Sequence, residues 1–305
     1  MSKNAALIEQ ILGESQKVIL GKELQIKLSL AAFISGSHLL IEDIPGVGKT
    51  TLAKTLARVL GLNYSRIQFT NDLLPSDIIG LNFYNTKDAT FSFKRGPIFS
   101  QFLLADEINR ASSKTQSALL EAMEEKQISV DGVTHKLPSP FFVIATKNPF
   151  EEVGTYELPS SQLDRFGLAI SLGYPSHEAE RAILASNAKV SLDSLKSLTP
   201  EESQGLQNAM SEVFVSEEIL TLIQEILAFT RDSSLYITGL STRAALSILN
   251  ISKAWAMIEL REYVVPGDVL EILPYIIRHR LQAKGASKTP QEIRDEITQN
   301  LHIDT

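Results

Sequence analysis

The chain contains no cysteine, which excludes disulfide bonds, thiolate metal sites and cysteine nucleophiles. It also lacks a long hydrophobic run, because the most apolar stretch, residues 28–41, is interrupted by small and polar residues at 35–38. A membrane span needs roughly 18 consecutive apolar residues. Residues 1–9 have neither the basic nor the apolar region of a signal peptide. The sequence therefore predicts a cytoplasmic protein without a membrane span or anchor.

An excess of positive charge is missing as well, since the formal net charge is −7. This balance argues against a protein that coats nucleic acid with its whole surface, although a local basic stripe stays open. The length of 305 residues allows about two domains, and an apolar share of 44% is ordinary for a globular protein.

Residues 43–50, Asp-Ile-Pro-Gly-Val-Gly-Lys-Thr, join an apolar strand-like run to a helix-prone stretch, residues 51–60. Such a glycine-rich turn binds a triphosphate, because the glycines let backbone N–H groups point at phosphate oxygens. The lysine adds a charge at the β- and γ-phosphates, and the following threonine offers a hydroxyl to Mg²⁺. Asp43 departs from the usual pattern, which has glycine there, and an ordinary Gly/Pro turn is the alternative. With the acid described next, the predicted ATP-binding residues are Pro45, Gly46, Val47, Gly48, Lys49, Thr50, Thr51 and Asp106.

A second motif, residues 102–107, is an apolar strand that ends in two acids, Asp106 and Glu107. Continuous hydrophobicity favours a strand of a parallel sheet, and ligands bind at the carboxyl ends of such strands. We expect Asp106 to hold Mg²⁺ together with Thr50, and Glu107 to polarise the attacking water. The alternative is an Asp-Glu cap that opens the next helix.

Further apolar strands are predicted at 64–69, 141–146 and 167–172, and a helical pattern lies between two of them, at 114–126. Together with the strand before the glycine-rich turn and the acidic strand at 102–107 they make five strands, and this alternation predicts a doubly wound α/β domain. Asn148 follows one of these strands, where it could orient the attacking water or touch the γ-phosphate; a turn-forming Asn-Pro is the alternative.

After a hinge at 173–175 the composition becomes helical. Residues 199–202 form a capping box, and helices are predicted at 217–230, with Leu220, Ile223 and Leu227 on one side, and at 241–257, with Leu246 and Leu249 inward. We therefore predict a nucleotide-binding domain over 1–173, an all-helical lid over 174–283, and a tail over 284–305 with one short helix.

Two insertions read as β-hairpins, near 80–97 and 127–138. The first alternates aromatic and polar residues, and the second carries Asp131-Gly132, which favours a type I′ turn. Exposed Phe91 and Phe93 would need burial, so a locally packed hairpin is the alternative to a substrate-gripping one. His135 is expected to be a solvated strand residue.

Four strings resemble the MoxR family of AAA+ ATPases over about residues 18–281. They are QFTNDLLPSD (68–77), LLADEINRA (103–111), TQSALLEAMEE (115–125) and LDRF (163–166). The resemblance implies an AAA+ P-loop core with a five-stranded parallel sheet in three layers (α/β/α), followed by a small helical lid. It also implies a ring, usually hexameric, with each ATP between neighbouring subunits. Family members often have another residue in place of the first glycine, as Asp43 is here.

The catalytic residues implied by the resemblance are Glu107, Asn148 as sensor 1, Arg165 as the arginine finger and Arg243 as sensor 2. Thr242 stands where the family usually has proline. A permanently charged guanidinium suits the charge that develops on a transferred phosphoryl group. Arg110 is a rival finger, and a surface ion pair is the alternative for each arginine.

These features predict an enzyme that hydrolyses ATP to ADP and phosphate and remodels a client protein. The resemblance implies a client with a von Willebrand factor A-type domain, and maturation, metal insertion or activation as the task. One alternative is a nucleotide-gated scaffold with little turnover. A nucleic-acid motor is supported only by Lys87, Lys94 and Arg95, and the acidic balance opposes it.

Overall fold

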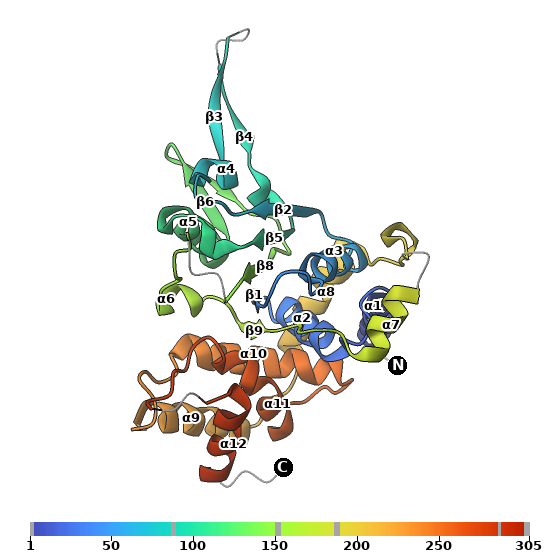
Figure 1. Cartoon of the computed structure of the whole chain (residues 1–305), viewed down its shortest axis with the longest axis vertical. Helices are drawn as coiled ribbons and strands as arrows, with labels where there is room; N and C mark the ends of the chain where they lie inside the picture. Colours follow the sequence, from blue (N-terminus) through green and yellow to red (C-terminus); the bar gives the residue numbers. More distant parts are fainter. Residues whose placement is uncertain are drawn as a thin grey trace.

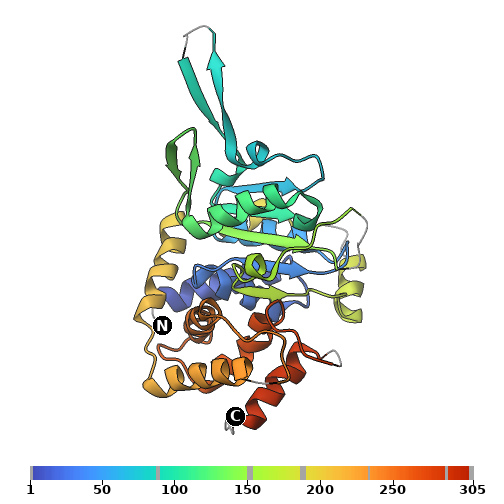
Figure 2. The same cartoon turned by 90° about the vertical axis from the view of Figure 1, so that its left-hand side faces the viewer.

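Five parallel strands form the central sheet of the computed structural model, in the order β2-β5-β8-β1-β9 (Figures 1 and 2). The structure describes residues 3–86, 90–149, 154–185, 190–232, 234–285 and 288–301. The strands are β1 (Leu39–Glu42), β2 (Tyr64–Gln68), β5 (Phe102–Asp106), β8 (Phe142–Lys147) and β9 (Leu168–Ile170). The predicted five-stranded parallel sheet is confirmed.

The sheet is buried on both faces, which is why its strands are continuously apolar. Alternate residues of β1 separate into two cores, since Leu39 and Ile41 face one side and Leu40 faces the other. The first side is covered by α1 (Lys3–Gln16), α2 (Glu23–Ile34) and α3 (Lys49–Val59). The second is covered by α4 (Pro75–Ile79) and α5 (Ser113–Glu125). The result is the predicted three-layer α/β/α arrangement.

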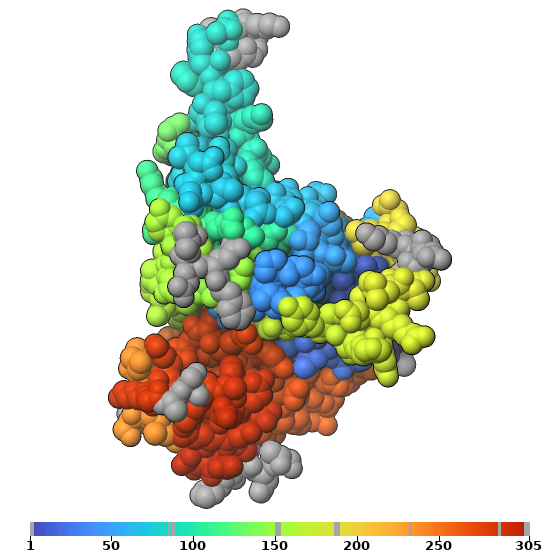
Figure 3. All heavy atoms as spheres, viewed as in Figure 1, coloured from blue at the N-terminus to red at the C-terminus, as the bar shows by residue number. Residues whose placement is uncertain are grey.

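Two antiparallel hairpins leave this core, as predicted. The longer one, β3 (Gly80–Asn85) and β4 (Thr90–Arg95), projects far from the sheet (Figure 3). The shorter one is β6 (Gln127–Val130) and β7 (Val133–Lys136), and its turn residues Asp131 and Gly132 have φ of 49° and 79°. Positive φ at both positions is what a type I′ turn requires.

Side chains along the shorter hairpin, its turn included, contact the longer hairpin. Phe93 stacks on His135 with ring centroids 4.3 Å apart, and Asn82 Nδ2 donates to Asp131 Oδ2 at 2.7 Å. Phe91, in contrast, is 76% exposed. The packed-hairpin alternative thus holds for Phe93 but not for Phe91, and His135 is a stacked rather than a solvated residue.

The C-terminal helices form a bundle beneath the sheet (Figure 1). Its members are α9 (Glu217–Asp232), α10 (Thr242–Ile258), α11 (Pro266–Ile277) and α12 (Pro290–Asn300). Helix α10 packs against both α2 and α11, so the bundle is joined to the α/β unit through a continuous core. Because α10 is covered on two sides, its predicted inward residues are partly wrong. Leu246 is 56% exposed, while Ile248 and Ile251 are buried.

The segment between sheet and bundle contains α7 (His177–Ala185), η3 (Leu192–Ser194), α8 (Pro200–Ala209) and η4 (Met210–Glu212). The predicted capping box of Thr199 and Glu202 opens α8. This segment is held by the α/β unit, since Leu198 N donates to Val59 O at 2.8 Å and Ser203 Oγ to Leu60 O at 2.7 Å. The domain limits at 173 and 283 remain predictions.

On α9, Leu220 is 36% exposed, whereas Ile223 and Leu227 are buried as predicted. Lys87, used above for the nucleic-acid alternative, and residues 302–305 of the tail lie outside the described residues. Across the described part of the chain, none of the helices is both long and apolar enough to pass through a membrane.

Candidate functional site

The glycine-rich loop connects the carboxyl end of β1 to α3. Gly46 and Gly48 have φ of 86° and 96°, a left-handed conformation that side chains with a Cβ rarely adopt. Gly48 is the N-cap of α3 and has no side chain to cap the first N–H groups of the helix. Such uncapped N–H groups and the helix dipole favour a phosphate. Pro45 and Val47 lie in the same turn, and Thr50 and Thr51 follow Lys49 in the first turn of α3.

Lys49 lies over this loop. Its Nζ donates to Asp43 O at 2.6 Å and to Ile44 O at 3.2 Å. The ammonium group is therefore held against the loop backbone, from where it can reach a phosphate placed on the loop.

Asp43, which replaces the usual first glycine, anchors the loop to the chain that follows β9. Its Oδ2 accepts from Gly173 N at 2.7 Å and from Ser171 Oγ at 3.0 Å, and its Oδ1 accepts from Ile44 N at 2.9 Å. Burial acts to raise the pKa of this carboxyl, but the three hydrogen bonds together hold the pKa below its usual value. The carboxylate is thus ionised at neutral pH and acts as a structural acceptor.

Asp106 ends β5 and is 7% exposed. Its Oδ1 accepts from Thr146 Oγ1 at 2.6 Å, and its Oδ2 accepts from Arg66 Nη2 at 2.7 Å and Nε at 3.1 Å. Two neighbouring strands therefore orient this carboxylate, β8 through Thr146 and β2 through Arg66.

Glu107 has φ of 58°, a left-handed conformation that is uncommon outside glycine and is found at functional sites. Its backbone N–H donates to Thr146 Oγ1 at 2.9 Å. Its carboxylate accepts from Gln68 Nε2 at 2.8 Å and lies 3.1 Å from Arg110 Nε. The turn thus directs Glu107 away from Asp106, and Arg110 pairs with the glutamate of its own chain.

The carboxyl ends of β5, β8 and β1 bring these groups to one edge of the sheet. Adjacent strands lie about 4.8 Å apart, so β1 and β5, on either side of β8, are separated by about 10 Å. Asn148 directly follows β8 between them and is 5% exposed. Lys49, Asn148, Asp106 and Glu107 therefore come to the same end of the sheet. The hydroxyl of Thr50 and the carboxylate of Asp106 are oxygen ligands of the kind that Mg²⁺ prefers.

Arg165 and Arg243 lie at the opposite edge. Arg165 precedes β9, and Gly167 N donates to His38 O at 2.9 Å, just before the amino end of β1. The four residues of β1 span about 13 Å, so this edge is separated from the glycine-rich loop by the height of the sheet.

Glu124, in the last turn of α5, contacts both arginines. Arg165 Nε lies 3.1 Å from Glu124 Oε2, without the geometry of a hydrogen bond, and Arg243 Nη2 pairs with Glu124 Oε1. The structure thus groups Arg243 with Arg165 and not with Lys49 of its own chain.

The backbone around Arg165 is held by a buried arginine of the bundle, Arg280. Its Nε donates to Asp164 Oδ1 at 2.7 Å and its Nη2 to Phe166 O at 2.6 Å. Burial lowers the pKa of Arg280, and its bond to Asp164 opposes this shift. Because Ser241 Oγ also donates to Asp164 Oδ2 at 2.8 Å, the bundle positions the loop of Arg165.

Sequence reasoning missed several of these residues. Arg66 and Gln68 alternate at the end of β2, and Thr146 precedes Asn148 by two residues, so the strand period could have placed them at this edge. Glu124 and Arg280 give no comparable local signal, because their partners are distant in sequence.

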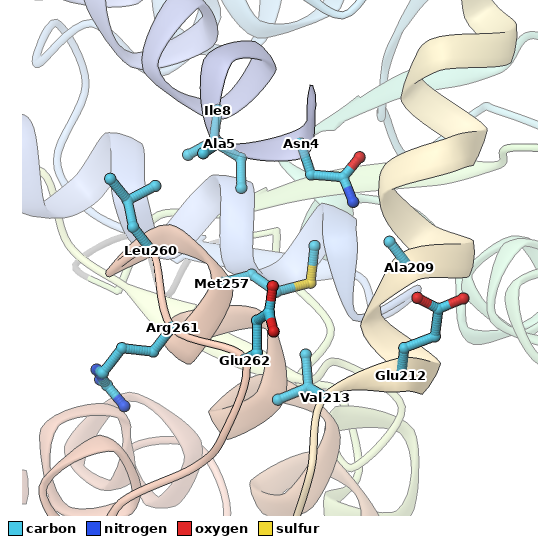
Figure 4. Close-up of a pocket in the computed structure, with 10 residues that line it drawn as sticks. All are labelled: Asn4, Ala5, Ile8, Ala209, Glu212, Val213, Met257, Leu260, Arg261 and Glu262. Carbon is cyan, nitrogen blue, oxygen red and sulfur yellow. The ribbon is translucent and has the colours of Figure 1, made fainter. Parts of the chain in front are cut away.

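A separate cavity of about 360 Å³ lies between α1, η4 and the turn after α10 (Figure 4). Its polar lining includes the carboxylates of Glu212 and Glu262, while Arg261 points away to pair with Asp268. Two carboxylates repel phosphates, so this cavity does not fit the triphosphate of a nucleotide.

A glycine-rich phosphate loop, an acidic strand end beside it and a helical bundle below the sheet define an AAA-type ATPase. In agreement, residues 38–168 match the family described as "ATPase family associated with various cellular activities (AAA)", and residues 228–300 match the AAA lid domain.

Comparison with individual proteins narrows this class. The chain is 38% identical to Chaperone MoxR1 of Mycobacterium tuberculosis, over 97% of this chain and 80% of the relative. It is 42% identical to the uncharacterized protein YeaC of Bacillus subtilis, over 89% and 86% respectively. The crystal structure of a candidate ATPase from Cytophaga hutchinsonii superimposes with a TM-score of 0.89 at 37% identity, over 97% and 94%. The chain belongs to the MoxR family of AAA+ ATPases.

Proposed function

We propose that the chain binds Mg·ATP at the carboxyl edge of its sheet and hydrolyses it to remodel a client protein. The placement of Asp106 and Glu107 at the carboxyl end of β5, Asn148 after β8 and Lys49 after the loop that follows β1, at one end of neighbouring strands, is the observation that carries this proposal. A family that contains a chaperone, MoxR1, supports action on a client.

The residues at this edge divide the chemistry among them. The loop N–H groups and Lys49 would bind the β- and γ-phosphates, while Thr50 and Asp106 would hold Mg²⁺, which would neutralise phosphate charge. Glu107 accepts the proton of the water that attacks the γ-phosphorus, as the bond to the ADP oxygen breaks. Asn148 orients that water.

A second subunit completes the site in this proposal. Arg165 and Arg243 lie a sheet height away from their own loop, so they fit the nucleotide of a neighbour rather than their own. An arginine supplied by a partner can raise the rate about 10³- to 10⁵-fold. We therefore propose a homo-oligomeric ring, with six subunits as the expected size, in which hydrolysis depends on assembly.

The two hairpins are the proposed contact with the client. Tyr84 and Phe91 are exposed on the projecting hairpin, with ring centroids 5.2 Å apart, and an exposed aromatic pair suits apolar segments of another protein. A client with a von Willebrand factor A-type domain, and metal insertion, maturation or activation as the task, belong to this proposal. Glu107 favours an enzyme over a nucleotide-gated scaffold, since a scaffold needs no group to activate water.

Three variants test the proposal. Lys49→Ala should lose ATP binding, measured by calorimetry, whereas Glu107→Gln should keep binding and lose turnover by at least about 100-fold, the usual contribution of a general base. Arg165→Ala should bind ATP normally and lose the dependence of activity on protein concentration. Lys54→Ala, on the exposed side of α3, is the matched control for the lysine. Equal ATP affinity in wild type and Lys49→Ala would contradict the loop assignment.

Mixing tests whether the arginine acts on the neighbour. Glu107→Gln and Arg165→Ala subunits are each inactive alone, but a mixed ring should regain activity at those interfaces that combine an intact Glu107 with an intact Arg165. Absence of recovery in rings shown to be mixed would contradict the shared site. Glu107→Gln with ATP is also suited to capture the client.

A further inference from the structure

A small cavity of about 220 Å³ lies where α5, the loop before β9 and α10 meet. Its lining includes three cations, Lys126, Arg165 and Arg243, together with two acids, Glu124 and Asp164. Asp164 is already engaged by Arg280 and Ser241 in the bundle. Asp164 Oδ2 also lies 3.9 Å from Arg243 Nη1, whereas Glu124 contacts both arginines assigned above to a neighbouring nucleotide.

The contacts of Glu124 use both of its oxygens. Oε2 lies 3.1 Å from Arg165 Nε, and Oε1 pairs with Arg243 Nη2. Guanidinium groups bind carboxylates and phosphates with the same planar fork. The single carboxylate thus pairs with Arg243 and lies against Arg165 Nε, so it stands beside both groups that a phosphate would bind.

The side chains of Glu124, Arg165 and Arg243 are 37%, 27% and 43% exposed, so both contacts of the carboxylate lie near solvent, although the Arg165 Nε atom itself is buried. Exposed pairs are weak, because water and salt screen them. A triphosphate carries more negative charge than one carboxylate, so it can displace Glu124 from both arginines when a neighbour presents it.

Glu124 is held in place by its helix. At the start of α5 the buried Gln116 donates through Nε2 to Ile108 O at 3.2 Å and to Ala111 O at 3.1 Å, next to Glu107. The next residue, Ser117, accepts through its Oγ a hydrogen bond of 3.2 Å from Gln162 Nε2, which lies close to the loop of Arg165. Helix α5 is thus fixed to the chain's own nucleotide edge and presents Glu124 at the opposite edge.

We propose that Glu124 is an internal competitor for the neighbour's ATP: it pairs with Arg165 and Arg243 in the isolated subunit and is displaced by phosphates when subunits assemble. This inference rests on the proposed function, because it requires the two arginines to reach a neighbouring nucleotide. Its consequence is that Glu124 raises the protein concentration needed for ATP-dependent assembly and so suppresses hydrolysis by unassembled subunits.

The test compares Glu124→Gln with wild type and with Glu125→Gln, an exposed neighbour on the same helix. Assembly is followed by analytical ultracentrifugation over a range of protein concentrations, with Mg²⁺ and a non-hydrolysable ATP analogue. Glu124→Gln should assemble at a concentration roughly 2- to 30-fold lower, the range that two exposed ion pairs span. Glu125→Gln should match wild type.

A second measurement does not depend on assembly. In the monomer without nucleotide, Arg165 and Arg243 should react faster with an arginine-specific reagent in Glu124→Gln than in Glu125→Gln, as quantified by mass spectrometry, at unchanged melting temperature. Equal assembly midpoints and equal reactivity in the two variants would overturn the role of Glu124. Failure of wild type to assemble with the analogue would instead overturn the shared site of the proposed function, and this inference with it.

Discussion

Replacing Asp43 by glycine restores the usual pattern of the phosphate loop, yet we expect it to destabilise this protein. The carboxylate is 7% exposed and accepts hydrogen bonds from Gly173 N, Ser171 Oγ and Ile44 N. Without it, the partly buried donors of Gly173 and Ser171 lose their acceptor, which costs about 1–2 kcal/mol for each group, the lower part of the range for buried groups. A glycine adds about 0.5–1 kcal/mol through the entropy of the unfolded chain.

The sum for Asp43→Gly is a loss of about 2.5–5 kcal/mol in the free energy of unfolding. For a chain of this size each kcal/mol lowers the melting temperature by about 2–4 °C, so a decrease of about 5 to 20 °C is expected in a thermal melt. Asp193→Gly is the control, because Asp193 is exposed and carries the same change in chain entropy. Equal melting temperatures in the two variants would refute the anchoring role of Asp43.

The anchoring role of Asp43 can also be tested through the pH dependence of the free energy of unfolding. The pKa of Asp43 is lowered in the folded protein from an ordinary value of 3.8, so between the two pKa values the folded state binds fewer protons than the unfolded state. The stability from Asp43 is therefore fully present above about pH 5 and is lost as pH falls below the ordinary value. The difference between wild type and Asp43→Gly should shrink in acid and stay constant from about pH 5 to 7.

Two further predictions concern the nucleotide edge. Gln116→Ala removes a buried amide that donates to three carbonyls and should lower the free energy of unfolding by about 2–4 kcal/mol in denaturant titration, whereas the exposed Gln127→Ala should leave it unchanged. Arg66→Gln frees a carboxylate oxygen of Asp106, so the Mg²⁺ concentration for half-maximal binding of an ATP analogue should fall roughly 2- to 5-fold. An unchanged or higher Mg²⁺ requirement would contradict a competition at Asp106.

Local sequence patterns predicted most of the strands and helices of the α/β core. Gly46, Gly48 and Lys49 are consecutive or nearly so, and the strand and helix around them follow from apolar period and turn chemistry. Asp131 and Gly132 specified the turn of the shorter hairpin for the same reason. The buried face of a helix was harder to predict. Helix α10 is covered by two partners, and its exposed Leu246 lies among apolar neighbours in the sequence.

Contacts between distant segments could not be derived in this way. Asp43 resembled a defect of the motif until Gly173, 130 positions away, was seen to donate to it. Arg243 was expected to act as a sensor within its lid, whereas the structure places it beside Arg165 through Glu124, which lies 119 positions away. The sequence offers no period or spacing that relates such residues.

The sequence by itself determined that a phosphate-binding loop, an acidic strand end and a helical lid occur in this order, because backbone geometry and burial impose these patterns on neighbouring residues. Only the tertiary structure decided which side chains share an edge of the sheet, and hence that Lys49 and Asp106 lie at one edge while Arg165 and Arg243 lie at the opposite one. The physical reason is that strand order and helix packing set these distances, and both depend on the whole core rather than on any local segment.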